Sequence, residues 1–278
     1  MRVGLLVGVT TAEMFQEAID HVKSFGFDFG QLCIWNPEIF TDENAELLKE
    51  LMKKNNFKFN QLWCGWHEPV IWGAPECYTT QGLVPDEHRE SRLENLRQGA
   101  LFAYKAGIDT IITHCGYIQE NPTSPTFIAV ADGLRKLCEE LASRGQRFAF
   151  ETGQEMPVTL KYMINAIGLD NVGINLDPAN LTSGARGNPY DAVDLLHTRI
   201  FGVHAKDASK PTFEKSGRQE PIGRGDVDFR RLIKQLHDYG YEGDLIIEHE
   251  IGRREAVRDD DIRFSKVYLE QIIENIYG

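Results

Sequence analysis

The chain has 278 residues, of which 42% are hydrophobic and 26% are charged. This length suits one large domain, and barrels of eight strand–helix units commonly have about 250 residues. The formal net charge of −12 argues against a nucleic-acid-binding surface, which needs concentrated lysine and arginine. No apolar run is long enough to cross a bilayer. The five cysteines are scattered without CxxC spacing, so we expect free thiols in a reducing, cytoplasmic compartment.

Short apolar runs alternate with amphipathic patterns along the whole chain. The runs predict eight strands, at residues 3–9, 28–35, 57–63, 110–114, 147–151, 172–177, 200–204 and 244–248. The patterns that follow them predict eight helices, at residues 13–25, 42–55, 89–106, 126–143, 158–167, 190–197, 228–239 and 262–277. The alternation predicts an α/β fold, a single-domain (β/α)8 TIM barrel over residues 1–278. A doubly wound open sheet is the structural alternative.

Four of the predicted strands end in side chains that commonly ligate metals, namely Glu151, Asp177, His204 and Glu248. Side chains alternate across a strand, and in three of these runs small or polar residues share the ligand's side while bulky apolar residues face the other way. The carboxyl ends of barrel strands meet at one rim, so we expect the four side chains to converge there.

Three carboxylates in one place repel each other unless a cation neutralises them. Three oxygen ligands and one nitrogen ligand favour Mn²⁺, Mg²⁺ or Co²⁺ over a sulfur-rich structural Zn²⁺ site. We therefore expect one divalent cation, with Mn²⁺ as the first candidate and Mg²⁺, Co²⁺ or Zn²⁺ as the others. The alternative is that each of the four is a polar rim residue hydrogen-bonded to its own neighbours.

Five short motifs resemble those of the sugar phosphate isomerase/epimerase family. They are ET at 151–152, NLDPANL at 175–181, GVHAKD at 202–207, IGRGDVDF at 222–229 and IIEHE at 246–250. That family uses xylose isomerase-like barrels and includes tagatose 3-epimerase-type, hydroxypyruvate isomerase-type and inosose-processing enzymes. The resemblance implies that the Glu, Asp, His and Glu named above bind one divalent ion.

Such a site suits proton abstraction beside the carbonyl of a keto-sugar or related polyol. The reaction passes through an enediolate, whose oxygens a divalent cation stabilises as a Lewis acid. One group must remove the proton and another must return it to the same or the neighbouring carbon. We expect Glu151 and Glu248 to do this, with Asp177 and His204 mainly holding the metal.

Seven further residues are candidate substrate contacts: Trp35, Trp66, His67, His114, Asn180, Lys206 and Arg224. The two histidines would contact sugar hydroxyls, or else are satisfied loop residues. The two tryptophans would form an apolar wall, or else simply fill space. The lysine could contact an oxyanion or pair with Asp207 at the rim, and the arginine could bind a hydroxyl or an anionic group.

Three other functions remain open. A keto-sugar or keto-inositol dehydratase or lyase would share the metal and the deprotonation step. An endonuclease IV-like nuclease would need three zinc ions, but Asn180 stands where those enzymes place a further histidine. A barrel that binds sugar without turnover is the non-enzymatic alternative. In each case except the nuclease the partner is a small molecule, and a homo-oligomer is expected on general grounds.

Overall fold

Eight parallel strands form a closed barrel in the order β1-β10-β7-β6-β5-β4-β3-β2. The computed structural model describes residues 1–67, 69–73, 75–252 and 255–278. The barrel strands are β1 (Arg2–Val9), β2 (Phe29–Ile34), β3 (Lys58–Cys64), β4 (Thr110–Thr113), β5 (Arg147–Glu151), β6 (Val172–Leu176), β7 (Ile200–Ala205) and β10 (Asp244–Ile247). The predicted TIM barrel is confirmed, and the open-sheet alternative is wrong.

Contacts divide the chain into two compact units. Unit 1 comprises residues 1–6, 152–158 and 174–278, and unit 2 comprises residues 7–151 and 159–173. Each unit contains a run of parallel strands in register. In unit 1, β1 pairs with β10, β10 with β7 and β7 with β6. In unit 2, β2 pairs with β3, β3 with β4 and β4 with β5.

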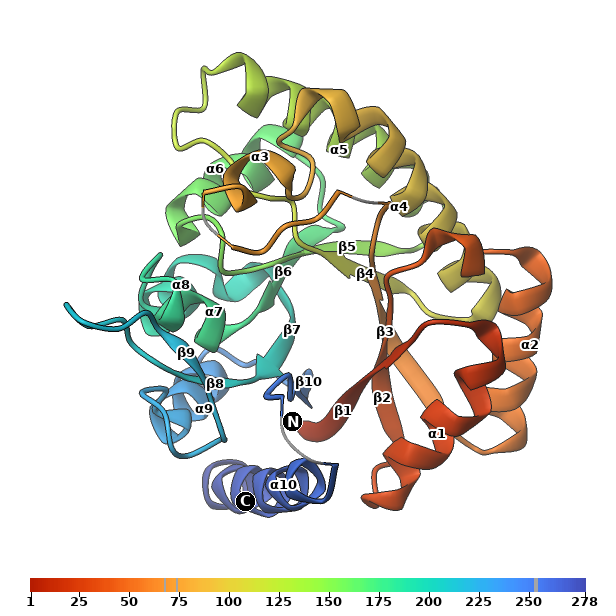
Figure 1. Ribbon diagram of the computed structural model, residues 1–278, viewed down its shortest axis with the longest axis vertical. Coiled ribbons are helices and arrows are strands. Elements are labelled where there is room, and N and C mark those ends of the chain that lie inside the picture. The colour runs from red at the N-terminus through yellow and green to blue at the C-terminus, as the bar shows by residue number, and fades with distance from the viewer. Residues whose placement is uncertain (68, 74, 253–254) are drawn as a thin grey trace. The chain divides into compact units, whose positions relative to one another are not determined.

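The long helices of unit 2 cover the outside of its four strands (Figure 1). They are α1 (Phe15–Ser24), α2 (Asp42–Lys54), α4 (Asp86–Ala106), α5 (Pro125–Ser143) and most of α6 (Pro157–Ile167). The short helix α3 (Cys77–Thr80) lies in the segment between β3 and α4, and the 3-10 turns η1 (Ala12–Met14) and η2 (Pro37–Ile39) precede α1 and α2. Helix α4 packs between α2 and α5. Its Gly99 allows the close approach to the strands, because a Cβ there would lie 2.7 Å from the Cys64 sulfur.

Unit 1 contains the helices α7 (Pro178–Ser183), α8 (Pro189–Leu196), α9 (Phe229–Asp238) and α10 (Glu255–Tyr277), with the 3-10 turn η3 (His197–Arg199). Side chains cap these helices where the sequence offers an Asn or Asp before the first turn. The Asp228 carboxylate accepts from the backbone N–H of Arg231 at the start of α9. Helix α9 packs against both α8 and α10 and buries Phe229 and Leu236 completely.

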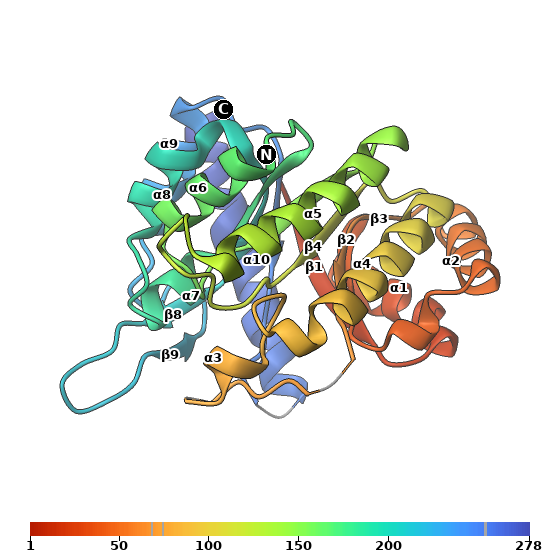
Figure 2. The ribbon, with the colours of Figure 1, turned by 90° about the horizontal axis from the view of Figure 1, so that it is seen from above.

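Helix α7 and two short strands of unit 1 fall outside the predicted strand–helix alternation. Strands β8 (Asp207–Ser209) and β9 (Arg218–Glu220) form a small antiparallel hairpin. The loop between them projects away from the rest of unit 1 and has the fully exposed Phe213 near its middle (Figure 2). The sequence shows this region only as a polar, glycine-bearing stretch, because strands of three residues are too short to produce an alternation pattern.

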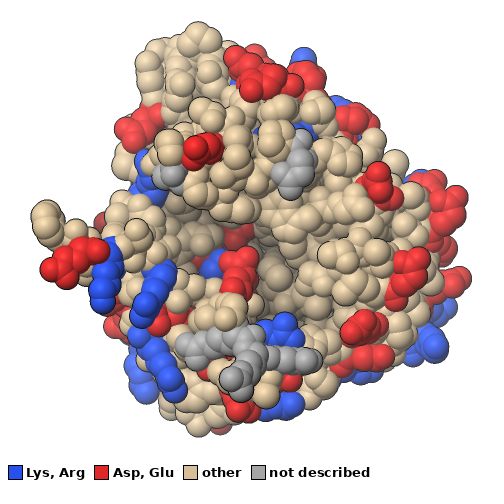
Figure 3. All heavy atoms as spheres, viewed as in Figure 1, with Lys and Arg blue, Asp and Glu red and all other residues tan. Residues whose placement is uncertain are grey.

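Charged side chains of both signs cover the visible surface (Figure 3). Basic side chains gather where β8, β9 and α9 lie in Figure 1, and acidic ones are spread over the helices of unit 2. Within the part of the chain that the structure describes, no helix has the length and hydropathy of a membrane span. All five cysteines are free and four of them are buried, as their spacing predicted.

Candidate metal and active site

Asp177, His204 and Glu248 lie together at the carboxyl ends of β6, β7 and β10 in unit 1. The His204 Nδ1 atom is 2.8 Å from Glu248 Oε2 and 3.7 Å from Asp177 Oδ2. Asp177 and His204 are completely buried, and Glu248 is 8% exposed. Because neighbouring parallel strands end at the same edge, three residues far apart in the sequence meet at one end of the sheet.

The two carboxylate oxygens of Asp177 face different neighbours. Its Oδ1 atom accepts from the backbone N–H of Asn180 and caps α7, where Pro178 occupies the favourable first position. Its Oδ2 atom is the one that faces His204. The Thr152 hydroxyl also bonds the Asp177 backbone, accepting from its N–H at 2.8 Å and donating to its carbonyl at 3.1 Å. The carboxylate is therefore held in one orientation.

Lys206 places a cation beside this cluster. Its ammonium group is 3.3 Å from Glu248 Oε2, 3.7 Å from Asp177 Oδ2 and 2.5 Å from Glu250 Oε2. Burial opposes the ionisation of Glu248, but the charges of Lys206 and His204 outweigh it and hold the pKa of Glu248 well below its ordinary value. Lys206 thus lies beside Glu248, and its contact with a substrate stays a prediction.

Gln219 of β9 secures the end of β10 and was missed by the sequence analysis. Its amide nitrogen donates to the Glu248 carbonyl at 3.0 Å, and its amide oxygen accepts from the Glu250 backbone N–H at 3.1 Å. No sequence signal could have found this contact, because it depends on the hairpin folding over the barrel strand.

Asp207 organises the glycine-bearing loop that precedes α9. Its carboxylate accepts backbone N–H groups from Ala208, Gly223, Gly225 and Val227, at 2.8 to 3.1 Å. Burial raises the pKa of Asp207, against the opposing effect of these donors. A Cβ on Gly225 would lie 2.2 Å from the carboxylate, so only glycine fits there. Asp207 therefore organises the loop, whereas the acidic groups beside Lys206 are Asp177, Glu248 and Glu250.

We expect Asp207→Ala to lower the free energy of unfolding by roughly 2–4 kcal/mol, because it leaves several N–H groups of the loop without an acceptor. Urea denaturation with a tryptophan fluorescence readout would measure this loss. Asp191→Ala, at an exposed position on α8, is the matched control. An Asp207→Ala protein within about 0.5 kcal/mol of the unsubstituted one would show that the loop does not depend on this carboxylate.

Glu151 ends β5 in unit 2 and is 2% exposed. Its Oε2 atom accepts a hydrogen bond from the Trp63 indole and lies 3.4 Å from His114 Nε2. Trp63 was not among the predicted site residues. The sequence feature that could have identified Trp63 is its position at the carboxyl end of β3, one residue before the strand ends. His114, which the sequence analysis named as a candidate substrate contact, lies next to Glu151.

The four predicted ligands form one group in the structure. Glu151, Asp177, His204 and Glu248 are all buried, and each offers one ligand atom within 4.8 Å of the others. Among the residues that the structure describes, this is the one such group of histidine, cysteine and acidic side chains. Its donor set of three carboxylates and one imidazole suits a divalent cation.

Aromatic side chains surround His114 and Trp63 in unit 2. The Trp35 ring centroid is 4.5 Å from that of Trp63, 5.4 Å from that of Trp66 and 5.9 Å from that of Trp72. Trp72, which the sequence analysis did not single out, is 54% exposed and also contacts His114. Trp66 is buried and its ring faces Arg92. The partly exposed Trp35 and Trp72 are thus better placed than Trp66 to form an apolar wall.

Three predicted contact residues lie outside the buried group. His67 is exposed, and its backbone N–H donates to Asn95 Oδ1. Asn180 contributes its backbone N–H to the α7 cap, and its Cβ is so close to Gly153 that any side chain at 153 would collide with it. Arg224 is exposed in the loop that Asp207 holds. Their roles toward a substrate stay predictions.

Similarity to known proteins covers nearly the whole chain. The chain is 26% identical to L-ribulose-5-phosphate 3-epimerase UlaE from Escherichia coli, over 85% of this chain and 82% of that protein. A crystal structure of a xylose isomerase domain protein from Planctomyces limnophilus superposes with a TM-score of 0.91 at 25% identity, covering 99% of this chain and 98% of that one.

A xylose isomerase-like TIM barrel protein from Mycobacterium smegmatis, crystallised in complex with magnesium, superposes with a TM-score of 0.70 at 16% identity, over 95% of this chain and 90% of that one. At this identity the likeness concerns the fold. The family model of the xylose isomerase-like TIM barrel matches residues 19–268. The chain therefore belongs to the xylose isomerase-like TIM barrel family.

Proposed function

We propose that this enzyme is a divalent-metal-dependent isomerase or epimerase of a keto-sugar or related polyol. The observation that carries the proposal is the buried group of three carboxylates and one histidine at the ends of four barrel strands. Similarity to a sugar-phosphate epimerase along most of the chain supports the same class of reaction.

The group fits a metal ion on chemical grounds. Three buried carboxylates packed together require a neutralising charge, and His204 and Lys206 supply part of it in the protein alone. Glu151, Asp177, His204 and Glu248 would hold the ion, and Mn²⁺ is the candidate that we favour among Mn²⁺, Mg²⁺, Co²⁺ and Zn²⁺. When bound, a divalent cation supplies Lewis-acid stabilisation to the oxygens of a sugar that loses a proton.

The protein's own side chains transfer the protons, orient the catalytic carboxylate and contact the substrate. Glu151 removes or returns a proton at one face of the substrate, and Glu248 does so at the other. The Trp63 indole and His114 keep the Glu151 carboxylate in one orientation. Trp35 and Trp72 offer ring faces for the C–H side of a sugar and exclude water from the reacting carbon. Lys206 lies where it can contact a substrate oxygen next to Glu248.

The alternatives are less well supported. A trinuclear nuclease needs more ligands, whereas His67 is exposed and Asn180 offers an amide in place of an imidazole. A sugar-binding barrel without turnover gives no reason to retain both glutamates in a buried group. A dehydratase or lyase would use the same residues for deprotonation and differs only in expelling a leaving group afterwards. The cytoplasmic location and a homo-oligomer stay predictions.

Incubation of the metal-loaded protein in D₂O with a panel of ketoses, keto-inositols and their phosphates tests the proposal. We expect deuterium at one carbon beside the carbonyl of at least one compound, detected by NMR, because abstraction and return exchange that proton with solvent. Isomerisation, epimerisation and elimination then differ in the product that accumulates. No exchange into any compound of the panel would contradict the proposed reaction.

A further inference from the structure

Lys206 is a buried cation among the acidic side chains of unit 1. It follows the last residue of β7, and its ammonium group lies 3.3 Å from Glu248 Oε2 and 3.7 Å from Asp177 Oδ2. A buried ammonium group is costly unless opposite charges surround it. Both of these carboxylates are candidate metal ligands, so Lys206 supplies positive charge to them from within the chain.

The two carboxylates cannot serve Lys206 and a divalent cation equally well. A cation held by Asp177 and Glu248 would lie near an ammonium group that is within 3.7 Å of both. Like charges repel strongly where little water is present to screen them. The long, flexible stem of a lysine allows its ammonium group to move while the backbone stays in place. Binding of a divalent ion should therefore be accompanied by movement of this ammonium group away from the two carboxylates.

Glu250 offers Lys206 another acidic partner. Its Oε2 atom is 2.5 Å from the Lys206 ammonium group, closer than either candidate ligand. The Glu250 side chain is 61% exposed, so it faces water while the other two carboxylates are buried. The Gln219 amide oxygen accepts from the Glu250 backbone N–H at 3.1 Å and fixes the backbone at this position. An ammonium group that leaves the buried carboxylates thus keeps a partner on the side toward solvent.

The arrangement differs from that of a simple structural ion pair. An ion pair needs one carboxylate for one ammonium group, whereas three acidic side chains contact Lys206 here. Two of the three belong to the group with metal-ligand geometry, and the third does not. Lys206 therefore lies between a buried pair of carboxylates that suits a stronger cation and an exposed carboxylate that suits the ammonium group alone.

We propose that Lys206 is an internal counter-ion that a divalent cation displaces, and that Glu250 is the positioning residue that receives the displaced ammonium group. Lys206 then lowers the metal affinity of the site by competing for its carboxylates, and Glu250 raises that affinity by holding Lys206 aside. This inference rests on the proposed function, because it takes the buried group to be a metal site. Lys206 released from Asp177 and Glu248 is also able to contact a substrate oxygen.

Isothermal titration of chelator-treated protein with Mn²⁺ tests the displacement. We expect Lys206→Met to bind Mn²⁺ about tenfold or more tightly than the unsubstituted protein, because no ammonium group competes for the carboxylates. Glu250→Gln should bind it about threefold or more weakly, because Lys206 loses its outer partner and stays with Asp177 and Glu248. Unchanged or weaker binding of Mn²⁺ by Lys206→Met would overturn the counter-ion role.

The double variant separates displacement from a direct attraction between Glu250 and the metal. A carboxylate that only attracts the metal through space would change the affinity by the same factor with or without Lys206. If Glu250 acts through Lys206, adding Glu250→Gln to Lys206→Met should leave the affinity for Mn²⁺ unchanged. Equal factors in the two backgrounds would overturn the positioning role of Glu250.

Thermal melts provide a second readout. Without metal, Lys206→Met should melt at a lower temperature than the unsubstituted protein, because the buried carboxylates lose their counter-ion. With saturating Mn²⁺ it should melt no lower, since the metal then supplies the charge. A metal-free Lys206→Met protein that melts like the unsubstituted one would contradict the proposal. Glu250→Gln alters an exposed side chain, so its titration tests the proposal even if Lys206→Met does not fold.

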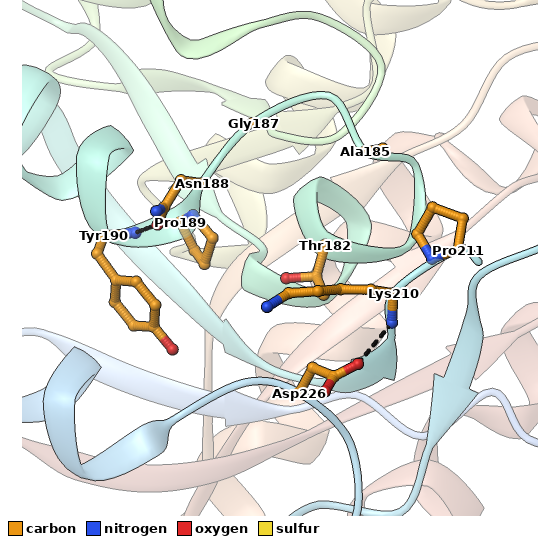
Figure 4. Close-up of a pocket in the computed structure, with 9 residues that line it drawn as sticks. All are labelled: Thr182, Ala185, Gly187, Asn188, Pro189, Tyr190, Lys210, Pro211 and Asp226. Carbon is orange, nitrogen blue, oxygen red and sulfur yellow. Dashed lines mark hydrogen bonds between the residues drawn. The ribbon is translucent and has the colours of Figure 1, made fainter. Parts of the chain in front are cut away.

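Lys210→Met is the matched control. Lys210 carries the same charge four residues further on and lines a pocket with Thr182, Tyr190 and Asp226 (Figure 4). Its affinity for Mn²⁺ and its melting temperature without metal should stay within error of those of the unsubstituted protein. An affinity gain equal to that of Lys206→Met would show a general effect of net charge and would overturn the proposal.

Mn²⁺ binding is measured without substrate, so the result does not depend on turnover. Displacement of Lys206 without deuterium exchange into any sugar would refute the proposed reaction alone. Exchange with metal affinities that Lys206→Met and Glu250→Gln leave unaltered would refute the counter-ion alone. Failure of the unsubstituted protein to bind Mn²⁺ or any other divalent ion would overturn both.

Discussion

Glu151→Gln and Glu248→Gln should each lower the rate of deuterium exchange into a substrate by roughly 10²–10⁴-fold, the usual contribution of a positioned acid or base. Glutamine keeps the shape of the side chain but cannot accept a proton. Rates would be measured by NMR in D₂O on protein whose metal content has been determined first. A loss of rate with the metal still bound separates proton transfer from metal binding.

The matched control for this pair is Glu242→Gln. Glu242 is exposed and precedes β10, the strand that Glu248 follows, so the same chemical change is made at the opposite end of one element. Its exchange rate should stay within twofold of that of the unsubstituted protein. If either site variant retained full exchange with metal bound, the acid–base role given to that glutamate would be wrong.

Removal of a ligand should abolish binding of the cation and the stability that binding adds. We expect the unsubstituted protein to bind one divalent ion per chain. When the free metal is at 100 times its Kd, addition of EDTA should lower the free energy of unfolding by about 2.7 kcal/mol. His204→Ala removes the imidazole donor. Asp177→Asn exchanges a ligand oxygen while an acceptor remains for the α7 cap. The melting temperature of neither variant should change when EDTA is added.

Metal analysis and thermal melts with and without EDTA provide the readout. His237→Ala, on the exposed side of α9, is the control and should melt and bind metal like the unsubstituted protein. Three ions per chain would support the nuclease alternative, and no bound ion in the unsubstituted protein would remove the basis for the proposed chemistry. Equal EDTA sensitivity in His204→Ala would show that this imidazole is not a ligand.

Several features of the site depend on contacts that no local pattern encodes. Trp63 donates to Glu151 from a strand 88 residues earlier in the chain, and Gln219 binds the end of β10 from a three-residue strand. Two glycines of the loop IGRGDVDF donate backbone N–H groups to the buried Asp207, which the sequence did not indicate, while the contact of Arg224 with a substrate stays a prediction.

The sequence by itself determined the strand–helix alternation, the barrel and the four strand ends that carry the candidate metal ligands. It could do so because apolar periodicity and strand ends are local, and parallel strands in a barrel must end on the same rim. The tertiary structure alone decided which groups orient those side chains and which of the predicted contacts lie outside the buried group. The physical reason is that hydrogen bonds between loops depend on distances in space, which the spacing of residues along the chain does not specify.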